Sequence, residues 1–274
     1  MLSSLRRNWP EYLMEAAGLG LVLLSAGMFI TLLEYPGSPV RAAISLAIPR
    51  RALAGLAVGL TVAGFIYSPW GQQSGAHLNP ALTLAFFRLR KIKPWDALFY
   101  VVAQCLGGVA GLWLVYRVLG NALSGPPVSF VVTTPGMAGA GVAFAAEFAM
   151  CFGLMSMVLV TTNGARWRRY TGWFAALLLF VYITLEAPLS GMSTNPARSL
   201  ASAILAGIWT AFWVYVLAPA LGMLAAAEVY LMVKGESSII CCKLNHAAGK
   251  RCIHCGAPGG SAKAGRPRAG EDGE

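Results

Sequence analysis

Charged side chains are scarce in this sequence. Asp, Glu, Lys and Arg make up 12% of its 274 residues, whereas hydrophobic residues make up 57%. Soluble domains carry about 25% charged residues, and the mean hydropathy of +0.63 is high for a soluble chain. The composition therefore excludes an ordinary soluble globular protein and predicts a membrane protein.

Acidic residues and histidines are also few. The chain has 11 Asp and Glu against 21 Lys and Arg, a net charge of +10, and 3 His. The apolar runs hold no nucleophile with a base and no metal cluster, so we predict that the protein is not an enzyme. An ion-coupled transporter is a weaker alternative, because it would place more ionisable residues at the midplane. The positive charge needs no nucleic-acid partner, since a basic cytoplasmic face that meets anionic lipids accounts for it.

Long apolar runs take the place of charge. A helix needs about 20 residues to cross a bilayer. Six runs come near or exceed that length: 13–33, 52–67, 95–118, 137–162, 170–188 and 208–233. Two shorter apolar stretches, 79–89 and 196–206, are too short to span and are interpreted as half-helices. We predict an all-α membrane protein with six transmembrane helices and two re-entrant half-helices.

The two halves of the chain repeat one order of elements. Residues 1–120 and 137–233 each run span, span, half-helix, span, and an extracytoplasmic loop at 121–136 joins them. Each half also has a Glu in its leading span and an Asn-Pro-Ala triplet before its half-helix. The matched residues are Glu15 with Glu147, and Asn79, Pro80 and Ala81 with Asn195, Pro196 and Ala197. Because three spans is an odd number, the halves form an inverted repeat and the half-helices enter from opposite sides.

The two triplets predict an electrostatic centre. Asn is a favoured N-cap, and proline suits the first helical position, where its missing N–H would be unpaired anyway. Two half-helices that meet each present the positive end of a dipole, about half an elementary charge. Their Asn side chains offer N–H donors to a passing oxygen, while protons and metal ions meet a barrier. We therefore predict a passive water channel that excludes protons and ions.

The sequence around each triplet carries a family resemblance. SGAHLNPALT at 74–83 and GMSTNPARS at 191–199 resemble the two signature loops of the aquaporin, or major intrinsic protein, family in its bacterial form. With Glu15, Glu147 and Gln104, the resemblance covers residues 11–233. It implies six tilted helices around an hourglass pore, usually four pores in a homotetramer, with each protomer conducting by itself.

The resemblance also implies which residues set selectivity. The two triplets form the pore centre, and the outer selectivity ring consists of Val58, Ile183, Met192 and Arg198. Water-selective members place an aromatic residue and a His beside the Arg, whereas this ring is apolar apart from its Arg. The alternative function is therefore a facilitator for glycerol, urea, ammonia or hydrogen peroxide. Ser199, where glycerol facilitators have Asp, favours water.

Three polar residues are expected to brace the loops. Glu15 and Glu147 lie inside apolar runs. The resemblance implies that each accepts hydrogen bonds from the backbone of a re-entrant loop, which finds no water at membrane depth. His77 is expected to line or brace its loop rather than bind a metal, because no second His or Cys lies near it in the sequence.

Basic residues indicate the orientation, because cytoplasmic loops carry an excess of Lys and Arg. With both termini inside, the N-terminal segment and the inner loops hold nine Lys and Arg, against four outside. The first run is too long for a signal peptide and is expected to remain as a membrane anchor. We expect a multi-pass protein of the plasma membrane, the inner membrane of a bacterium, with both termini cytoplasmic.

The last segment, 234–274, differs sharply from the rest. It is polar and Gly-rich, and we expect a disordered cytoplasmic tail. It nevertheless holds five candidate ligands for zinc, since thiolate and imidazole suit that ion: Cys241, Cys242, His246, Cys252 and Cys255. The alternative is a set of reduced cytosolic thiols. No other cofactor is predicted, and the expected partners are lipid, water and small neutral solutes.

Overall fold

The computed structural model describes residues 1–246 and 251–257, which form helices and loops without a strand. Residues 247–250 and 258–274, part of the predicted tail, lie outside the described residues. In chain order the α-helices and the short 3-10 helices (η) are α1 (Leu2–Glu34), α2 (Pro39–Ala43), α3 (Ala47–Tyr67), α4 (Pro69–Ser74), α5 (Pro80–Arg88), α6 (Pro94–Leu119), α7 (Asn121–Ser124), η1 (Ser129–Val131), α8 (Gly139–Asn163), η2 (Arg168–Tyr170), α9 (Thr171–Leu185), α10 (Ala187–Ser190), α11 (Pro196–Ala206), α12 (Phe212–Lys234) and η3 (Glu236–Ser238).

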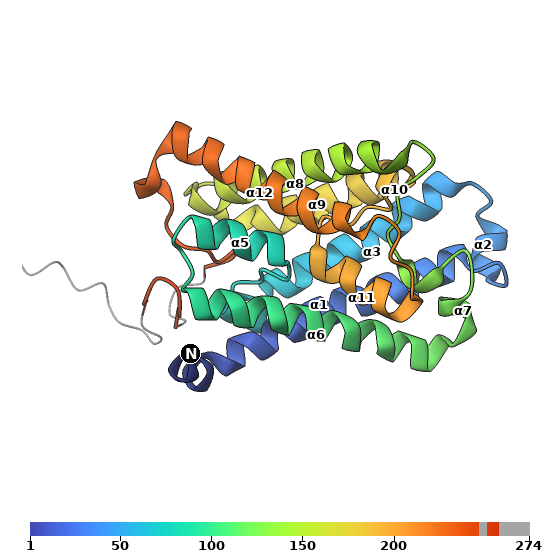
Figure 1. Ribbon diagram of the computed structural model, residues 1–274, viewed down its shortest axis with the longest axis horizontal. Coiled ribbons are helices and arrows are strands. Elements are labelled where there is room, and N and C mark those ends of the chain that lie inside the picture. Colours follow the sequence, from blue (N-terminus) through green and yellow to red (C-terminus); the bar gives the residue numbers. More distant parts are fainter. Residues whose placement is uncertain (247–250, 258–274) are drawn as a thin grey trace, which may run out of the picture.

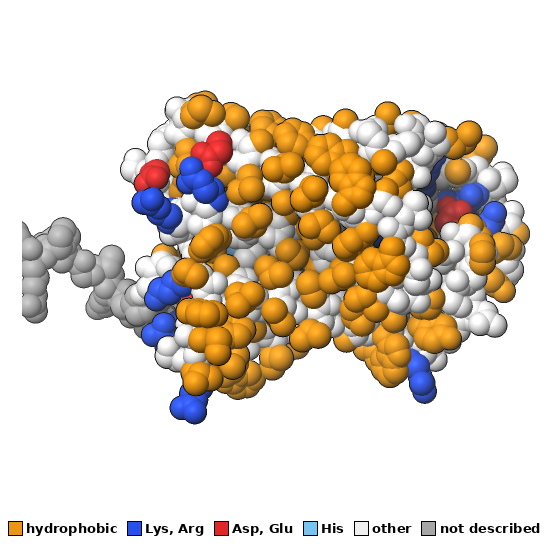
Figure 2. Space-filling view, in the orientation of Figure 1, with side chains coloured by type: hydrophobic (Ala, Val, Ile, Leu, Met, Phe, Trp, Pro, Cys, Tyr) orange, Lys and Arg blue, Asp and Glu red, His pale blue; other side chains and the backbone are white. Residues whose placement is uncertain are grey.

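The long helices run side by side along the long axis of the molecule (Figure 1). In the described part of the chain, α1, α3, α6, α8 and α12 are long and apolar enough to cross a membrane. α9 is shorter, with 15 residues. The short helix η2 precedes it directly, and α10 follows it. Hydrophobic side chains cover the middle of the visible face, and basic side chains lie towards its two ends (Figure 2). The predicted all-α membrane fold is confirmed.

The half-helices α5 and α11 lie between the long helices. α5 is nearer the end of the bundle that holds the N-terminus and the exit of α12, and α11 is nearer the opposite end (Figure 1). We call these ends the tail end and the far end. Since α5 and α11 also contact each other, the two half-helices meet inside the bundle after entering it from opposite ends.

Matching glycines bring the first and last long helix of each half close together. A Cβ added at Gly107 on α6 would lie 2.0 Å from the Ala16 oxygen on α1. In the second half, a Cβ at Gly222 on α12 would lie 2.4 Å from the Phe148 oxygen on α8. Only a residue without a side chain permits this approach. The internal repeat therefore extends to the packing of the helices.

The described part of the tail corrects the prediction of disorder. Cys241, Cys242, Lys243 and Leu244 are each at most 6% exposed. The Leu244 N–H donates to the Gly75 oxygen at 3.0 Å, so the chain returns to the loop before α5. The average composition of 234–274 was misleading because it conceals the apolar residues that pack, namely Ile239, Cys241, Cys242, Leu244 and Cys252. The correction applies to 235–246 and 251–257.

Candidate functional site

An Asn-Pro step begins each half-helix. The Asn79 Oδ1 accepts a hydrogen bond from the Ala81 N–H at 2.9 Å, and the Asn195 Oδ1 accepts one from the Ala197 N–H at 3.0 Å. Both Asn residues have extended backbone, and a proline follows each at the start of the helix. These caps fix the first turn of each half-helix. The positive ends of the two helix dipoles therefore point to the middle of the bundle.

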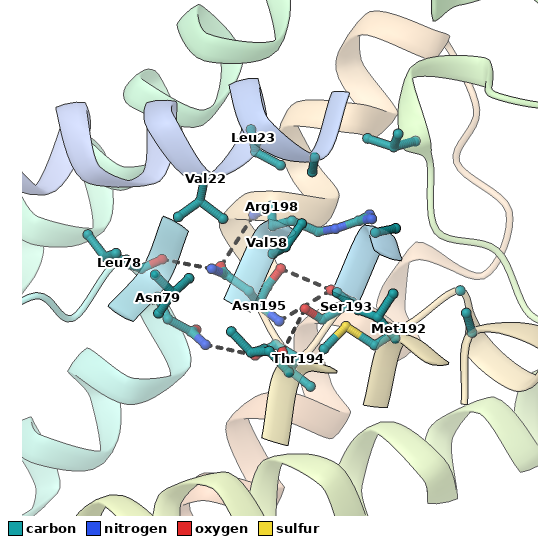
Figure 3. Close-up of a pocket in the computed structure, with 18 of the residues that line it drawn as sticks. Val22, Leu23, Val58, Leu78, Asn79, Met192, Ser193, Thr194, Asn195 and Arg198 are labelled. Carbon is teal, nitrogen blue, oxygen red and sulfur yellow. Dashed lines mark hydrogen bonds between the residues drawn. The ribbon is translucent and has the colours of Figure 1, made fainter. Parts of the chain in front are cut away.

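The same two Asn side chains tie the loops together. The Asn79 Nδ2 donates to the Thr194 carbonyl at 2.7 Å, and the Asn195 Nδ2 donates to the Leu78 carbonyl at 2.7 Å (Figure 3). A side-chain amide has two N–H groups, so each Asn keeps a second donor. Both Asn residues line one cavity, and the remaining donors are available to an oxygen inside it.

Glu15 on α1 braces the first loop. Its Oε1 accepts from the Ser74 hydroxyl at 2.8 Å and the His77 N–H at 3.0 Å. Its Oε2 accepts from the Leu78 N–H at 2.7 Å and the Gln104 Nε2 at 2.9 Å. The side chain is fully buried. It satisfies backbone donors that have no water at this depth.

Glu147 on α8 braces the second loop in the same way. Its Oε1 accepts from the Ser190 hydroxyl at 2.6 Å and the Ser193 N–H at 2.6 Å, and its Oε2 accepts from the Thr194 N–H at 2.7 Å. Glu147 is also fully buried. The structure thus places both predicted Glu residues against the backbone of the re-entrant loops.

The hydrogen bonds to the two Glu side chains stabilise loop conformations with positive φ values, which are otherwise unfavourable. Gly75 and Gly191 open the loops with φ values of 109° and 79°. Residues with a Cβ follow at positive φ in both loops, at Ala76 and Leu78 and at Met192 and Thr194. Such conformations persist where the surrounding structure fixes them. The fixed loops orient the carbonyls that receive the Asn side chains.

Two tyrosines complete the bracing, and sequence reasoning missed this role. The Tyr100 hydroxyl donates to the Ser74 carbonyl at 2.6 Å, and the Tyr215 hydroxyl donates to the Ser190 carbonyl at 2.7 Å. Both tyrosines are fully buried. A signal was present, because each Ser precedes its Asn by five positions and each Tyr follows in the next long helix. Aligning the two halves residue by residue would have found both pairs.

A cavity of about 570 Å³ runs past the meeting point of the loops. Glu34 and Arg51 line it towards the far end, Asn79 and Asn195 line its middle, and Leu244 lines it towards the tail end. Most of its wall is aliphatic. The cavity wall is therefore mainly apolar, with the Asn donors at its middle and charged side chains towards the far end.

The four residues of the predicted ring come together at this cavity. Val58, Ile183 and Met192 form one buried apolar cluster and line the cavity with Arg198. Figure 3 shows Val58, Met192 and Arg198 near the Asn195 loop. Within the described residues, the Arg198 Nη1 is buried without a hydrogen-bond partner. This donor is therefore free for a polar solute, and the rest of the ring is apolar.

His77 lies behind the first loop, where its ring bridges two groups. Its Nδ1 is 3.0 Å from the Thr83 hydroxyl, and its Nε2 is 3.0 Å from the Cys242 carbonyl. Ser193 holds the matching place in the second loop, with its hydroxyl 2.6 Å from the Ser199 hydroxyl. The His77 ring thus connects the first loop to the tail.

The structure brings together four of the five predicted metal ligands. The ligand atoms of Cys241, His246, Cys252 and Cys255 all lie within 4.8 Å of one another. Cys242 is not in this group; it is fully buried, and its carbonyl faces His77. The cluster contains three thiols and an imidazole, a donor set suited to zinc.

A family model described as Major intrinsic protein matches residues 7–230. "Aquaporin NIP3-1" of Zea mays is 40% identical over 182 residues, which cover 64% of this chain and 57% of the maize protein. "Aquaporin A" of Dictyostelium discoideum is 35% identical over 210 residues, 73% of each chain. The chain thus spans little more than half of the maize relative.

A solved structure shares the fold. The X-ray structure of the aquaglyceroporin from Plasmodium falciparum aligns with a TM-score of 0.66 and 21% sequence identity. The alignment covers 81% of this chain and 94% of that one. At this identity the likeness concerns the arrangement of helices.

Proposed function

Since this chain belongs to the major intrinsic protein family and is a multi-pass membrane protein, we propose that it is a passive channel for water. One observation carries the proposal: two capped half-helices meet beside a shared cavity, and Asn79 and Asn195 each keep an N–H donor for it. Water can exchange its bulk hydrogen bonds for these donors in passing.

Exclusion of ions and protons follows from charge at the same place. Each half-helix contributes about half a positive charge at its N-terminus, and Arg198 adds a full charge nearer the far end. A cation would lose its hydration shell in an aliphatic cavity and meet positive potential. A neutral solute meets neither cost.

The ring favours a second candidate function, a facilitator for small uncharged solutes such as glycerol, urea, ammonia or hydrogen peroxide. Val58, Ile183 and Met192 give it an apolar wall, which suits the carbon skeleton of glycerol, and the Arg198 donor would bind an oxygen of glycerol, urea or hydrogen peroxide. The solved structure with the same fold is titled an aquaglyceroporin. Met192 has a flexible side chain that can fill the ring, and for this reason we put water first.

The proposed location is the plasma membrane, the inner membrane if the host is a bacterium, with both termini in the cytoplasm. The excess of basic residues at the tail end supports this orientation. We also propose a homotetramer. Native mass spectrometry of the purified protein tests the assembly, and a mass other than four chains would overturn it.

Conduction needs no cofactor in this proposal, and zinc is assigned to the tail alone. Cys241, His246, Cys252 and Cys255 would hold it, because their donor atoms are close enough to share one ion. Metal analysis of the purified full-length protein should find about one zinc per chain, as for a closed four-ligand site.

Stopped-flow light scattering on reconstituted vesicles tests the function. Shrinkage against an impermeant sugar reports water flow, and reswelling in glycerol, urea and ammonium gradients reports solute flow. Fast shrinkage without reswelling supports the water channel, whereas slow shrinkage with fast reswelling supports the facilitator. Saturable uptake that depends on an ion gradient would overturn both.

A further inference from the structure

The tail cluster is compact enough for its four ligand atoms to share one metal ion, since they all lie within 4.8 Å of one another. Zinc binds thiolate at about 2.3 Å and imidazole at about 2.0 to 2.1 Å, so neighbouring ligand atoms are separated by about 3.3 to 3.8 Å. The Cys241 and Cys252 sulfurs are 3.6 Å apart, and the His246 Nε2 is 3.2 Å from the Cys255 sulfur. Four soft ligands in this arrangement leave no open coordination position, so the ion would have a structural role.

The turn at Cys252 is built as a ligand pair. The Cys255 N–H points to the Cys252 sulfur at 3.5 Å, and Gly256 follows with φ of 76°, a conformation that glycine adopts without strain. The Gly256 N–H donates to the Cys252 oxygen at 3.1 Å. Backbone therefore holds both sulfurs on one side of the turn.

The residues between α12 and the cluster pack on the tail end of the bundle and reach the cavity at Leu244. We call 239–244 the mouth segment. On one side the Ile240 N–H donates to Asn163 Oδ1 at the end of α8 at 2.8 Å. On the other side the Lys243 Nζ donates to the Gln72 oxygen at 3.0 Å, and the Leu244 N–H donates to Gly75. The segment is thus anchored to α8 by one bond and to α4 and the loop after it by two others.

Leu244 is the part of the mouth segment that reaches the conduction path. It lines the same cavity as Asn79 and Asn195 and is 6% exposed. An apolar side chain at the end of a narrow aliphatic path offers water no hydrogen bond. The mouth segment therefore contributes an apolar side chain to the tail-end part of the cavity wall.

Between the ligand residues of the cluster, the chain contacts the first loop and α1. The His254 ring stacks on His77 with centroids 6.0 Å apart, and its Nε2 is 3.3 Å from the Tyr100 hydroxyl. Arg251 donates to the Asn8 Oδ1 at 2.9 Å. The cluster joins this part of the tail to the mouth segment.

We propose that zinc at Cys241, His246, Cys252 and Cys255 locks the mouth segment across the tail-end mouth, so that the channel is closed with zinc and opens when zinc is lost. Cys241 belongs to the mouth segment and Cys252 to the part packed on the first loop. The shared ion is therefore the link that keeps both in place. This inference rests on the proposed channel function for its conduction readout.

The first experiment compares zinc-loaded and zinc-free full-length protein. Protein purified with ZnCl₂ is reconstituted, half of the vesicles receive a membrane-permeant zinc chelator, and water permeability is measured by stopped flow. We expect permeability to rise at least threefold after chelation and to fall again when ZnCl₂ is restored. If the protein binds zinc but its water permeability does not change after chelation, the lock would be overturned, while the metal site itself would be supported. A Cys241–Cys252 disulfide without zinc would overturn the metal site.

Two variants separate the lock from the obstruction. Cys252→Ser removes a ligand and should lose zinc and be open without chelator, whereas Cys105→Ser in α6 is the matched control and should behave as wild type. Leu244→Ala shortens the obstructing side chain outside the ligand set. It should retain zinc and conduct faster than wild type in the zinc-loaded state. Equal permeability of zinc-loaded Leu244→Ala and wild type would contradict the obstruction.

A readout that is independent of conduction distinguishes failure of the lock from failure of the channel. Cys242 belongs to the mouth segment, is not a ligand and is fully buried, so alkylation mapped by mass spectrometry reports release of this segment. Zinc-loaded protein should protect Cys242, and chelation should expose it, with Cys105 unchanged. If chelation exposes Cys242 but no water flows, the zinc lock would be supported and the proposed water channel would be overturned. Protection of Cys242 after complete zinc removal would overturn the lock.

Discussion

The two re-entrant loops have the same frame but different supports. In each, a buried Glu, a Ser and a Tyr hold the loop, and an Asn crosses to the other. The first loop has Gln104 as an extra donor to its Glu, whereas the matching position of α12 is Pro219, which has no side-chain donor. The first loop also supports the tail through His77. The frame is thus common to both halves, and the differences lie where one loop contacts the tail and the other bears the ring.

Removing the carboxylates should have the largest effect. Glu147→Ala leaves two backbone N–H groups and the Ser190 hydroxyl without their acceptor, and Glu15→Ala leaves a similar set. At about 1 to 3 kcal/mol for each unsatisfied buried group, either variant should lose about 3 kcal/mol or more of stability. Thermal unfolding in detergent measures the loss. Strong destabilisation by only one of the two would show that the frames are not equivalent.

Arg198→Leu should change selectivity more than stability. It gives the second loop the residue type that the first has at Leu82, and it removes the charge and the free Nη1 donor from the ring. We expect urea and glycerol permeability to rise severalfold while water flow persists, because the ring becomes wider and neutral. Arg198→Lys, which keeps the charge, is the control. A drop in water flow with no gain in solute flow would argue against a selectivity role.

Gln104→Met should have an intermediate effect confined to the first loop. It deletes a bond to a carboxylate, worth about 1.5 to 3 kcal/mol, while keeping similar volume. Pro219→Ala in the second half serves as the comparison, because no side-chain bond is lost there. A larger loss from Pro219→Ala than from Gln104→Met would show that Gln104 is not a support.

Tyr100→Phe and Tyr215→Phe should have the smallest effects, about 1 kcal/mol each for one neutral hydrogen bond. The two should differ in a second measurement, because only Tyr100 also lies beside His254. Alkylation of Cys242 should therefore speed up in Tyr100→Phe alone. Equal rates of Cys242 alkylation in the two variants would show that Tyr100 does not help to hold the tail on the first loop.

Much of the frame was predictable because local rules specify it. The Asn-Pro steps predict a cap and a helix start, and the length of the apolar runs separates spans from half-helices. Glu15 and Glu147 stood out because a carboxylate in an apolar run needs a partner. The family resemblance then indicated the ring residues, and the structure places all four at one cavity.

The tail and the tyrosines could not be placed by the same reasoning. Tyr100 and Tyr215 look like ordinary aromatic residues within a span, since their hydroxyl partners are distant in the chain. The packing of Leu244 depends on a carbonyl freed by the twist at Gly75, which composition does not reveal. Cys242 differs from its neighbour Cys241 only in the direction of its side chain, so sequence grouped them as ligands.

The exchange of bonds between Asn79 and Asn195 has a consequence for biogenesis. Each Asn donates to a carbonyl of the other half, so neither half contains a finished pore centre. When the ribosome has completed the first half, Asn79 and the Leu78 carbonyl still lack these partners at membrane depth. The second half must arrive before the centre is satisfied, and a nascent chain halted between the halves is a membrane protein without a conducting path.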